Sequence, residues 1–172
     1  LRNLTSIGDG GYLTIMDNIA LTNVDGLANL TYIGGILRIS GNKALTNLDG
    51  LANITGIAGF LEIFNNPALT NIDGLAKLTS VAAYLSIYDN PALTNCQGIA
   101  TVLGLPNGPP DDNVGGDITV ANNTSGCNSI GEILEVYSYS LPEIIFLALL
   151  TTTQGILGTF EATSTPPEEV LQ

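Results

Sequence analysis

Apolar residues recur along the chain with a period of 24. Leu13, Leu37, Leu61 and Leu85 hold equivalent positions, and an isoleucine follows each of them two residues later. Within each copy the apolar positions alternate with variable ones, which is typical of a strand with one buried face. A fixed period of this length indicates a solenoid whose equivalent strands stack ~4.8 Å apart as a parallel sheet. The pattern therefore predicts an all-β solenoid of about five coils.

An asparagine follows each predicted strand at the same register. The four positions are Asn18, Asn42, Asn66 and Asn90. Amide side chains repeated every ~4.8 Å can bond to the repeats on both sides and satisfy the backbone groups of a corner. We expect a structural ladder here. A second column, expected to serve the next corner, consists of Asn23, Asn47, Asn71 and Asn95.

The period is broken at both ends of the repeat region. The first repeat is two residues longer than the others, and the GDGG segment at residues 8–11 is the expected place for the excess. Ile118 and Val120 match Leu85 and Ile87 with nine additional residues between them, which predicts a fifth repeat preceded by an inserted loop. We therefore assign residues 1–127 to the solenoid, including the loop at 104–114, and residues 128–172 to a C-terminal cap and tail.

The two cysteines are placed for a disulfide. Cys96 occupies an inward position of its repeat, and Cys127 follows the same corner one repeat later. Equivalent Cα atoms of neighbouring repeats lie ~5 Å apart, within the ~4.4–6.8 Å that a disulfide needs. We predict a Cys96–Cys127 bridge that stabilises the fold by roughly 3–4 kcal/mol. Such a bridge is typical of an oxidising, extracellular setting.

Helix signals replace the repeat after residue 128. The segments SIGE at 129–132 and SLPE at 140–143 both fit the S-x-x-E capping box, so we expect two short helices as a cap. The second would carry a segment that is apolar on every side and has to be buried. The residues predicted to mediate self-association there are Ile144, Ile145, Phe146, Leu147, Leu149 and Leu150.

Large apolar side chains also occupy outward positions of the predicted strands. They are Tyr12, Met16, Phe60, Phe64, Tyr84 and Tyr88. A contiguous exposed patch of this kind usually marks an interaction site, and we predict that these six residues bind a partner. The patch could be covered by the C-terminal part of the chain, by another copy, or by a protein or glycan ligand.

Composition narrows the function classes. The chain has no His, which removes the commonest general base and metal ligand, so we expect no enzyme activity, no metal and no cofactor. The formal net charge of −12 disfavours nucleic acid. No run approaches the ~18 apolar residues that cross a bilayer. The chain starts without Met or a leader, as expected of a processed protein or an excised piece.

The repeat resembles a known family. Its consensus, NPALTNLDGLxNLTSIGGxLxI, is similar to the receptor L-domain-like coils related to leucine-rich repeats, which occur in secreted and surface proteins, many of them bacterial. The segments NCQGI, GGDITVANN and GCNSIGEIL resemble the terminal coil of bacterial members. The resemblance extends from residue 1 to about residue 134. It implies a right-handed, three-sided solenoid at or outside the cell surface, without catalytic residues, that serves as a recognition or spacer module.

Three functions are compatible with these patterns. We predict an extracellular recognition or adhesion module that presents the aromatic sheet. The alternative is a fibre subunit, because the first repeat has no cap and leaves an open strand edge, while the apolar C-terminal segment could meet a neighbour. A less favoured hypothesis is ice binding through two threonine columns. These are Thr5, Thr31, Thr55 and Thr79, and Thr22, Thr46, Thr70 and Thr94.

Overall fold

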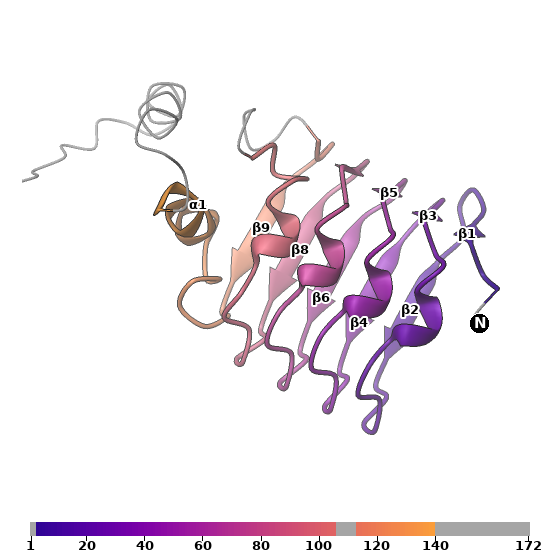
Figure 1. The fold of residues 1–172 in the computed structure, drawn as a ribbon, viewed down its shortest axis with the longest axis horizontal. Coiled ribbons are helices and arrows are strands. Elements are labelled where there is room, and N and C mark those ends of the chain that lie inside the picture. The colour runs from indigo at the N-terminus through magenta and orange to yellow at the C-terminus, as the bar shows by residue number, and fades with distance from the viewer. Residues whose placement is uncertain (1–2, 106–112, 140–172) are drawn as a thin grey trace, which may run out of the picture. The chain divides into compact units, whose positions relative to one another are not determined.

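The computed structural model describes residues 3–105 and 113–139, with side chains described up to residue 135. In this part of the chain, strands from successive repeats lie side by side in two parallel sheets (Figure 1). The larger sheet is formed, in this order, by β2 (Leu13–Met16), β4 (Leu37–Ser40), β6 (Leu61–Phe64), β8 (Leu85–Tyr88) and β9 (Ile118–Ala121). The smaller sheet is formed by β1 (Ser6–Ile7), β3 (Tyr32–Ile33), β5 (Gly56–Ile57) and β7 (Ser80–Val81). The predicted parallel all-β repeat is confirmed.

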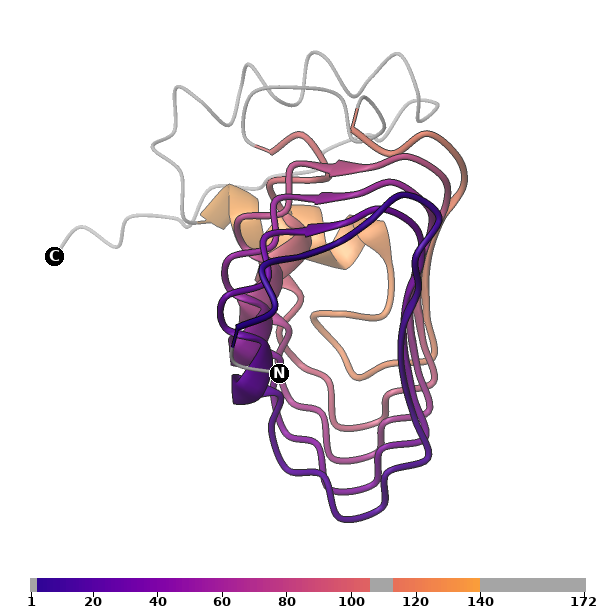
Figure 2. The ribbon, with the colours of Figure 1, turned by 90° about the vertical axis from the view of Figure 1, so that its right-hand side faces the viewer.

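The register of the sheets follows the sequence period. Leu13 pairs with Leu37 at a separation of 24 residues, whereas Ile7 pairs with Ile33 at a separation of 26. The two additional residues of the first repeat therefore lie between β1 and β2, where the GDGG segment was expected to hold them. Leu85 pairs with Ile118, which confirms the predicted match of the fifth repeat. Viewed along the stack, the repeats follow nearly the same path (Figure 2).

The core is a set of stacked aliphatic columns. The inward leucine and isoleucine of β4, β6 and β8 have no exposed surface, as the alternation predicts. In the first repeat, Leu13 and Ile15 are half-exposed because no described strand lies on the outer side of β2. Burial is therefore complete only where a repeat has a neighbour on each side.

The asparagine ladder is confirmed in detail. Asn66 Nδ2 donates to Ile39 O of the preceding repeat (3.1 Å), to Phe64 O of its own repeat (3.0 Å) and to Asn90 Oδ1 of the next (3.2 Å). Asn42, Asn66 and Asn90 are completely buried. The amides thus satisfy the backbone at a corner that water does not reach.

A short 3-10 turn forms the next corner of each repeat. The four turns are η1 (Asp25–Leu27), η2 (Asp49–Leu51), η3 (Asp73–Leu75) and η4 (Gln97–Ile99). The second asparagine column bonds to the start of these turns, since Asn47 Oδ1, for example, accepts a bond from Asp49 N at 3.1 Å. This column therefore serves its corner, as expected, by bonding within its own repeat.

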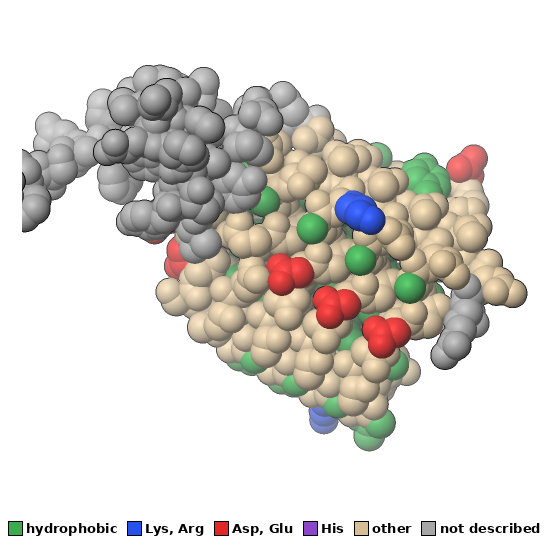
Figure 3. Space-filling view, viewed as in Figure 1, with side chains coloured by type: hydrophobic (Ala, Val, Ile, Leu, Met, Phe, Trp, Pro, Cys, Tyr) green, Lys and Arg blue, Asp and Glu red, His purple; other side chains and the backbone are tan. Residues whose placement is uncertain are grey.

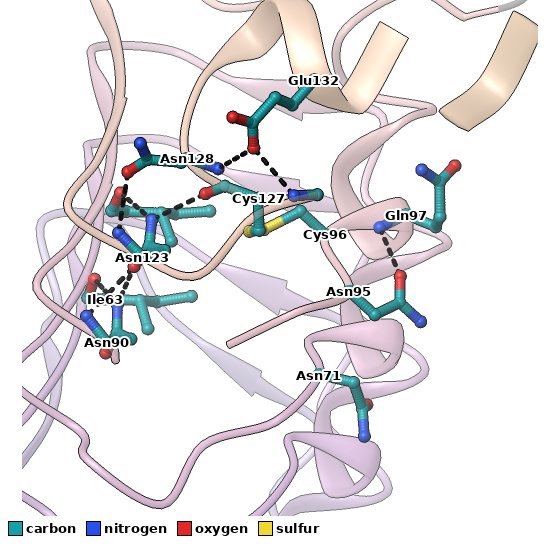
Figure 4. The surroundings of a disulfide bond; sticks show 12 residues. Ile63, Asn71, Asn90, Asn95, Cys96, Gln97, Asn123, Cys127, Asn128 and Glu132 are labelled. Atoms are coloured by element: carbon teal, nitrogen blue, oxygen red, sulfur yellow. Dashed lines mark hydrogen bonds between the residues drawn. A yellow bond between two sulfur atoms is a disulfide. The ribbon is translucent and has the colours of Figure 1, made fainter. Parts of the chain in front are cut away.

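The C-terminal end of the stack is closed by a disulfide and a helix. Cys96 and Cys127 are bonded as predicted, with Cα atoms 5.4 Å apart and both side chains buried (Figure 4). Asn123 N donates to Asn128 Oδ1 at 3.1 Å, so Asn128 takes the place that the asparagine of a further repeat would occupy. The ladder is therefore ended by a residue that imitates its next member.

Helix α1 (Ile130–Tyr139) begins at the first predicted capping box. Ser129 Oγ accepts from Glu132 N at 3.1 Å, which is one half of the box. The Glu132 carboxylate does not return to Ser129 but accepts from Gly126 N (2.8 Å) and Asn128 N (2.9 Å), which secures the disulfide loop. The second predicted helix and the six self-association residues at 144–150 lie outside the described residues, as does most of the inserted loop.

Two features are absent from the described residues. No helix among them has the length and apolar character that crossing a membrane requires. Within residues 3–105 and 113–139, no group of three or more His, Cys, Asp or Glu side chains is arranged to hold a metal ion.

Candidate functional site

The outward side of β6 and β8 carries two pairs of stacked aromatic rings. Parallel pairing places Phe60 beside Tyr84 and Phe64 beside Tyr88. The ring centroids are 4.5 Å apart in the first pair and 5.0 Å apart in the second, and the planes lie within 9° and 4° of parallel. All four side chains are half-buried. We call these four residues the aromatic face.

A charged side chain lies between the two pairs and is fixed from both sides. Glu62 occupies the outward position of β6 between Phe60 and Phe64. Its Oε2 accepts from Arg38 Nε at 2.5 Å, and its Oε1 accepts from Tyr84 OH at 2.9 Å. The Arg38 guanidinium also lies over the Phe60 ring, 5.3 Å from the centroid. The polar groups therefore hold the first aromatic pair in place.

The ionisation of these groups follows from their contacts. The hydrogen bond to Glu62 raises the pKa of Arg38. Partial burial, followed by the hydrogen bond to Glu62, raises the pKa of Tyr84. Burial is also the main cause that raises the pKa of Tyr88. At neutral pH both phenols are thus uncharged, and the one Arg38 charge is balanced by Glu62.

Tyr12 and Met16 lie apart from the other four predicted binding residues. Both are exposed, at 67% and 41%, on the first repeat. The second repeat separates them from the aromatic face and contributes Ile36 and Ser40 at the equivalent outward positions. The six residues therefore share one side of the sheet, and four of them form the two stacked pairs.

The threonine columns use their hydroxyl protons within the stack. Thr55 Oγ1 donates to Thr31 O at 3.2 Å, and Thr79 Oγ1 donates to Thr55 O at 2.9 Å. In the other column, Thr70 Oγ1 donates to Thr46 O at 3.1 Å. Such hydroxyls can only accept from water, which weakens the case for an ordered water lattice on either column.

A groove beside the aromatic face was not predicted from the sequence. One residue in each repeat, directly after the strand of the larger sheet, adopts a left-handed conformation with φ between 54° and 69°. These residues line a shallow groove of about 570 Å³ together with Lys43, Pro67 and Pro91. The left-handed residues are Asp17, Gly41, Asn65, Asp89 and Asn122. The signal was present, because Gly, Asn and Asp are the residues that tolerate this conformation.

Comparisons with protein-family models, with curated proteins and with solved structures find no match. The resemblance to receptor L-domain-like coils therefore remains a prediction from the repeat.

Proposed function

We propose that the protein is a non-catalytic recognition or adhesion module that works outside the cell and binds its ligand through the aromatic face. The observation that carries the proposal is the fixed arrangement of the half-exposed rings around Glu62, with Arg38 bonded to it. Tyr, Phe and Arg are enriched in interfaces, and Tyr and Arg are enriched among the residues that dominate binding energy. Side chains that are already fixed lose little conformational freedom when a ligand binds.

The ionisable groups support a role without catalysis. Hydrogen bonding to Glu62 raises the pKa of Arg38, and partial burial raises the pKa values of Tyr84 and Tyr88, so all three move further from neutrality. An efficient general acid or base has its pKa near the working pH. The aromatic face therefore suits binding rather than proton transfer.

The proposal also covers the cellular location of the protein and the handedness and number of sides of its repeats. The buried disulfide suits an oxidising setting, which supports secretion or display at the cell surface. We propose that the repeats wind as a right-handed, three-sided solenoid of the receptor L-domain-like type. Each of the first four repeats contributes a long strand, a short strand and a 3-10 turn to three separate columns, which supports the three-sided reading.

A defined array of glycans and purified extracellular proteins tests the recognition role. The variant Tyr84→Ser/Tyr88→Ser removes one ring from each stacked pair. Tyr32→Ser is the matched control, because it removes an exposed tyrosine from the smaller sheet. We expect a ligand whose affinity falls at least about tenfold in the double variant and is unchanged in the control. A ligand that binds the double variant as tightly as the wild type would contradict the proposed site.

A fibre subunit is the second candidate. It is favoured by the outer edge of β2, which no described strand pairs, and by the half-exposed Leu13 and Ile15 beside it. The closed C-terminal end, where Asn128 replaces the next ladder member, counts against continuous stacking. Negative-stain microscopy distinguishes the two functions. Filaments that disappear in Thr14→Pro, which removes an N–H from the strand at this edge, would support the fibre.

A further inference from the structure

The groove beside the aromatic face runs across all five repeats. Its lining includes Asp17 from the first repeat, Lys43 from the second, Asn65 from the third, Asp89 from the fourth and Asn122 from the fifth. Equivalent positions of stacked parallel strands are ~4.8 Å apart, so the groove extends for about 19 Å along the stack. A site with this form matches a ligand that is itself extended.

The side chains in the groove offer both acceptors and donors. Within the described residues, the side chains of Asp17, Lys43 and Asn65 form no hydrogen bond to the protein. Asp89 Oδ1 accepts from Asn122 Nδ2 at 2.9 Å, which leaves the second carboxylate oxygen open to a ligand. Two carboxylates, one ammonium group and two amides are thus distributed along the groove.

The backbone of the same positions is already used between repeats. Asp17 N donates to Ser40 O at 3.0 Å, Gly41 N to Asn65 O at 3.1 Å and Asp89 N to Ala121 O at 3.3 Å. A peptide strand adds to a sheet through a continuous row of free main-chain groups, and three of the five N–H groups at these positions are already bonded. The recognition chemistry therefore comes from side chains.

We propose that the groove binds a linear, uncharged polysaccharide that lies along the stack. A sugar hydroxyl both donates and accepts, so a polyhydroxyl chain can satisfy carboxylate, ammonium and amide groups in sequence. Anionic polymers are disfavoured, because the groove holds two carboxylates against one ammonium and the chain carries a net charge of −12.

The inference rests on the recognition function proposed above and extends it to a class of ligand. The groove residues Asn65 and Asp89 directly follow Phe64 and Tyr88, the last residues of β6 and β8. The two rings therefore come one residue before the groove lining, and within the lining Pro67 and Pro91 supply apolar surface for the C–H groups of a sugar. One polymer chain can thus contact the groove and the edge of the aromatic face together.

Calorimetric titration with defined oligosaccharides tests the inference. The probes are β-1,4-glucan, β-1,3-glucan and chitin oligomers of increasing length, with hyaluronan as the anionic comparator. We expect an uncharged oligomer to bind with an affinity that rises with length until it spans about 19 Å and then levels off. Hyaluronan should bind at least tenfold more weakly. The inference is overturned if none of the uncharged oligomers binds, if affinity is independent of length, or if hyaluronan binds equally well.

The variant Asp17→Gly/Asn65→Gly/Asp89→Gly empties the groove without backbone strain, because Gly41 naturally holds the same conformation, with φ of 69°. Asp25→Asn/Asp49→Asn on the 3-10 turns is the control, since it changes the net charge equally. We expect at least a tenfold loss of affinity in the groove variant, at an unchanged unfolding midpoint, and no loss in the control.

Tyr84→Ser/Tyr88→Ser separates this inference from the proposed function. If the groove variant binds normally and the tyrosine variant does not, the groove assignment fails and the aromatic face remains the site. If the groove variant alone loses binding, the groove assignment stands and the aromatic face is not required.

Discussion

At the scale of single residues, stability depends on side chains that connect neighbouring repeats. Asn66 bonds to the backbone of the repeat before it and of its own repeat, and to the amide of the repeat after it. It also accepts from Asn42 N at 3.1 Å. One side chain therefore satisfies polar groups of three repeats in a region that excludes water.

Asn66→Ala should be strongly destabilising. The substitution leaves Ile39 O and Asn42 N buried without these partners, and each unsatisfied group costs about 1–3 kcal/mol. We expect a loss of about 3 kcal/mol or more in the free energy of unfolding, measured by urea denaturation. Asn18→Ala is the control, because Asn18 is the exposed first member of the ladder. Equal losses in the two variants would show that burial does not set the cost.

Gly74→Ala should destabilise the fold, because the added side chain prevents the close approach of two neighbouring repeats. A Cβ atom at Gly74 would overlap with Leu48 O of the preceding repeat, whereas a Cβ at Gly26 would meet nothing within 4 Å. We expect Gly74→Ala to lower the thermal unfolding midpoint strongly or to prevent folding, and Gly26→Ala to leave it nearly unchanged. A midpoint for Gly74→Ala that matches the wild type would contradict the observed packing.

Tyr84 should make stability sensitive to alkaline pH. Its pKa in the fold is raised above the ordinary value of about 10, so the folded chain holds the phenol proton more tightly than the unfolded chain does. This contribution is fully present below pH ~10 and is lost as the pH rises through the raised pKa. In Tyr84→Phe, stability should fall less steeply in that range. Urea midpoints measured across it check the prediction, and identical slopes for both proteins would contradict it.

At the scale of elements, the sequence predicts what the period alone determines. The strands of the larger sheet, the buried asparagines and the Cys96–Cys127 bridge all follow from stacking equivalent residues at one spacing. The strands of the smaller sheet are only two residues long, too short for an alternating pattern to be recognised. The termination by Asn128 depends on a single tight loop without a repeat, so the period carries no information about it.

The candidate site was partly predictable for the same reason. Alternation correctly placed Phe60, Phe64, Tyr84 and Tyr88 on one side of the sheet. The 24-residue period also makes Phe60 a neighbour of Tyr84 and Phe64 a neighbour of Tyr88. The parallel ring stacking and the burial that results from it depend on side-chain conformations and on the position of Arg38, which the period does not determine. The groove was missed because its signal is a backbone conformation rather than a pattern of hydrophobicity.

The disulfide should stabilise the closed C-terminal end. It joins residues separated by 31 positions, and the chain-entropy model gives a contribution of about 3–4 kcal/mol for a loop of this length. We expect Cys96→Ser/Cys127→Ser to unfold at a lower urea concentration. Adding a reductant should lower the midpoint of the wild type but not that of the variant. A wild-type midpoint that does not respond to reduction of the bond would contradict this role.

At the scale of the whole molecule, like charges are aligned by the repeat. Asp25, Asp49 and Asp73 are exposed and occupy equivalent positions of successive 3-10 turns, so their carboxylates follow one another at the repeat spacing of ~4.8 Å. Figure 3 shows acidic side chains in a row on this side of the protein. Asn95 Nδ2 donates to both Asp73 oxygens, at 3.1 and 3.2 Å, which compensates one end of the row. Asp49 in the middle has a carboxylate on each side.

Salt should therefore stabilise the protein, and Asp49→Asn should reproduce part of that effect. The Debye length falls from about 30 Å at 0.01 M to about 3 Å at 1 M salt, which screens the repulsion along the row. We expect the wild-type Tm to rise by about 2 °C or more over this range, and Asp49→Asn to raise Tm at low salt while reducing the response to salt. Asp9→Asn, in the loop between β1 and β2, removes the same charge away from the 3-10 turns and serves as the control. An equal gain in the two variants would assign the effect to the net charge of −12 rather than to the alignment of carboxylates by the repeat.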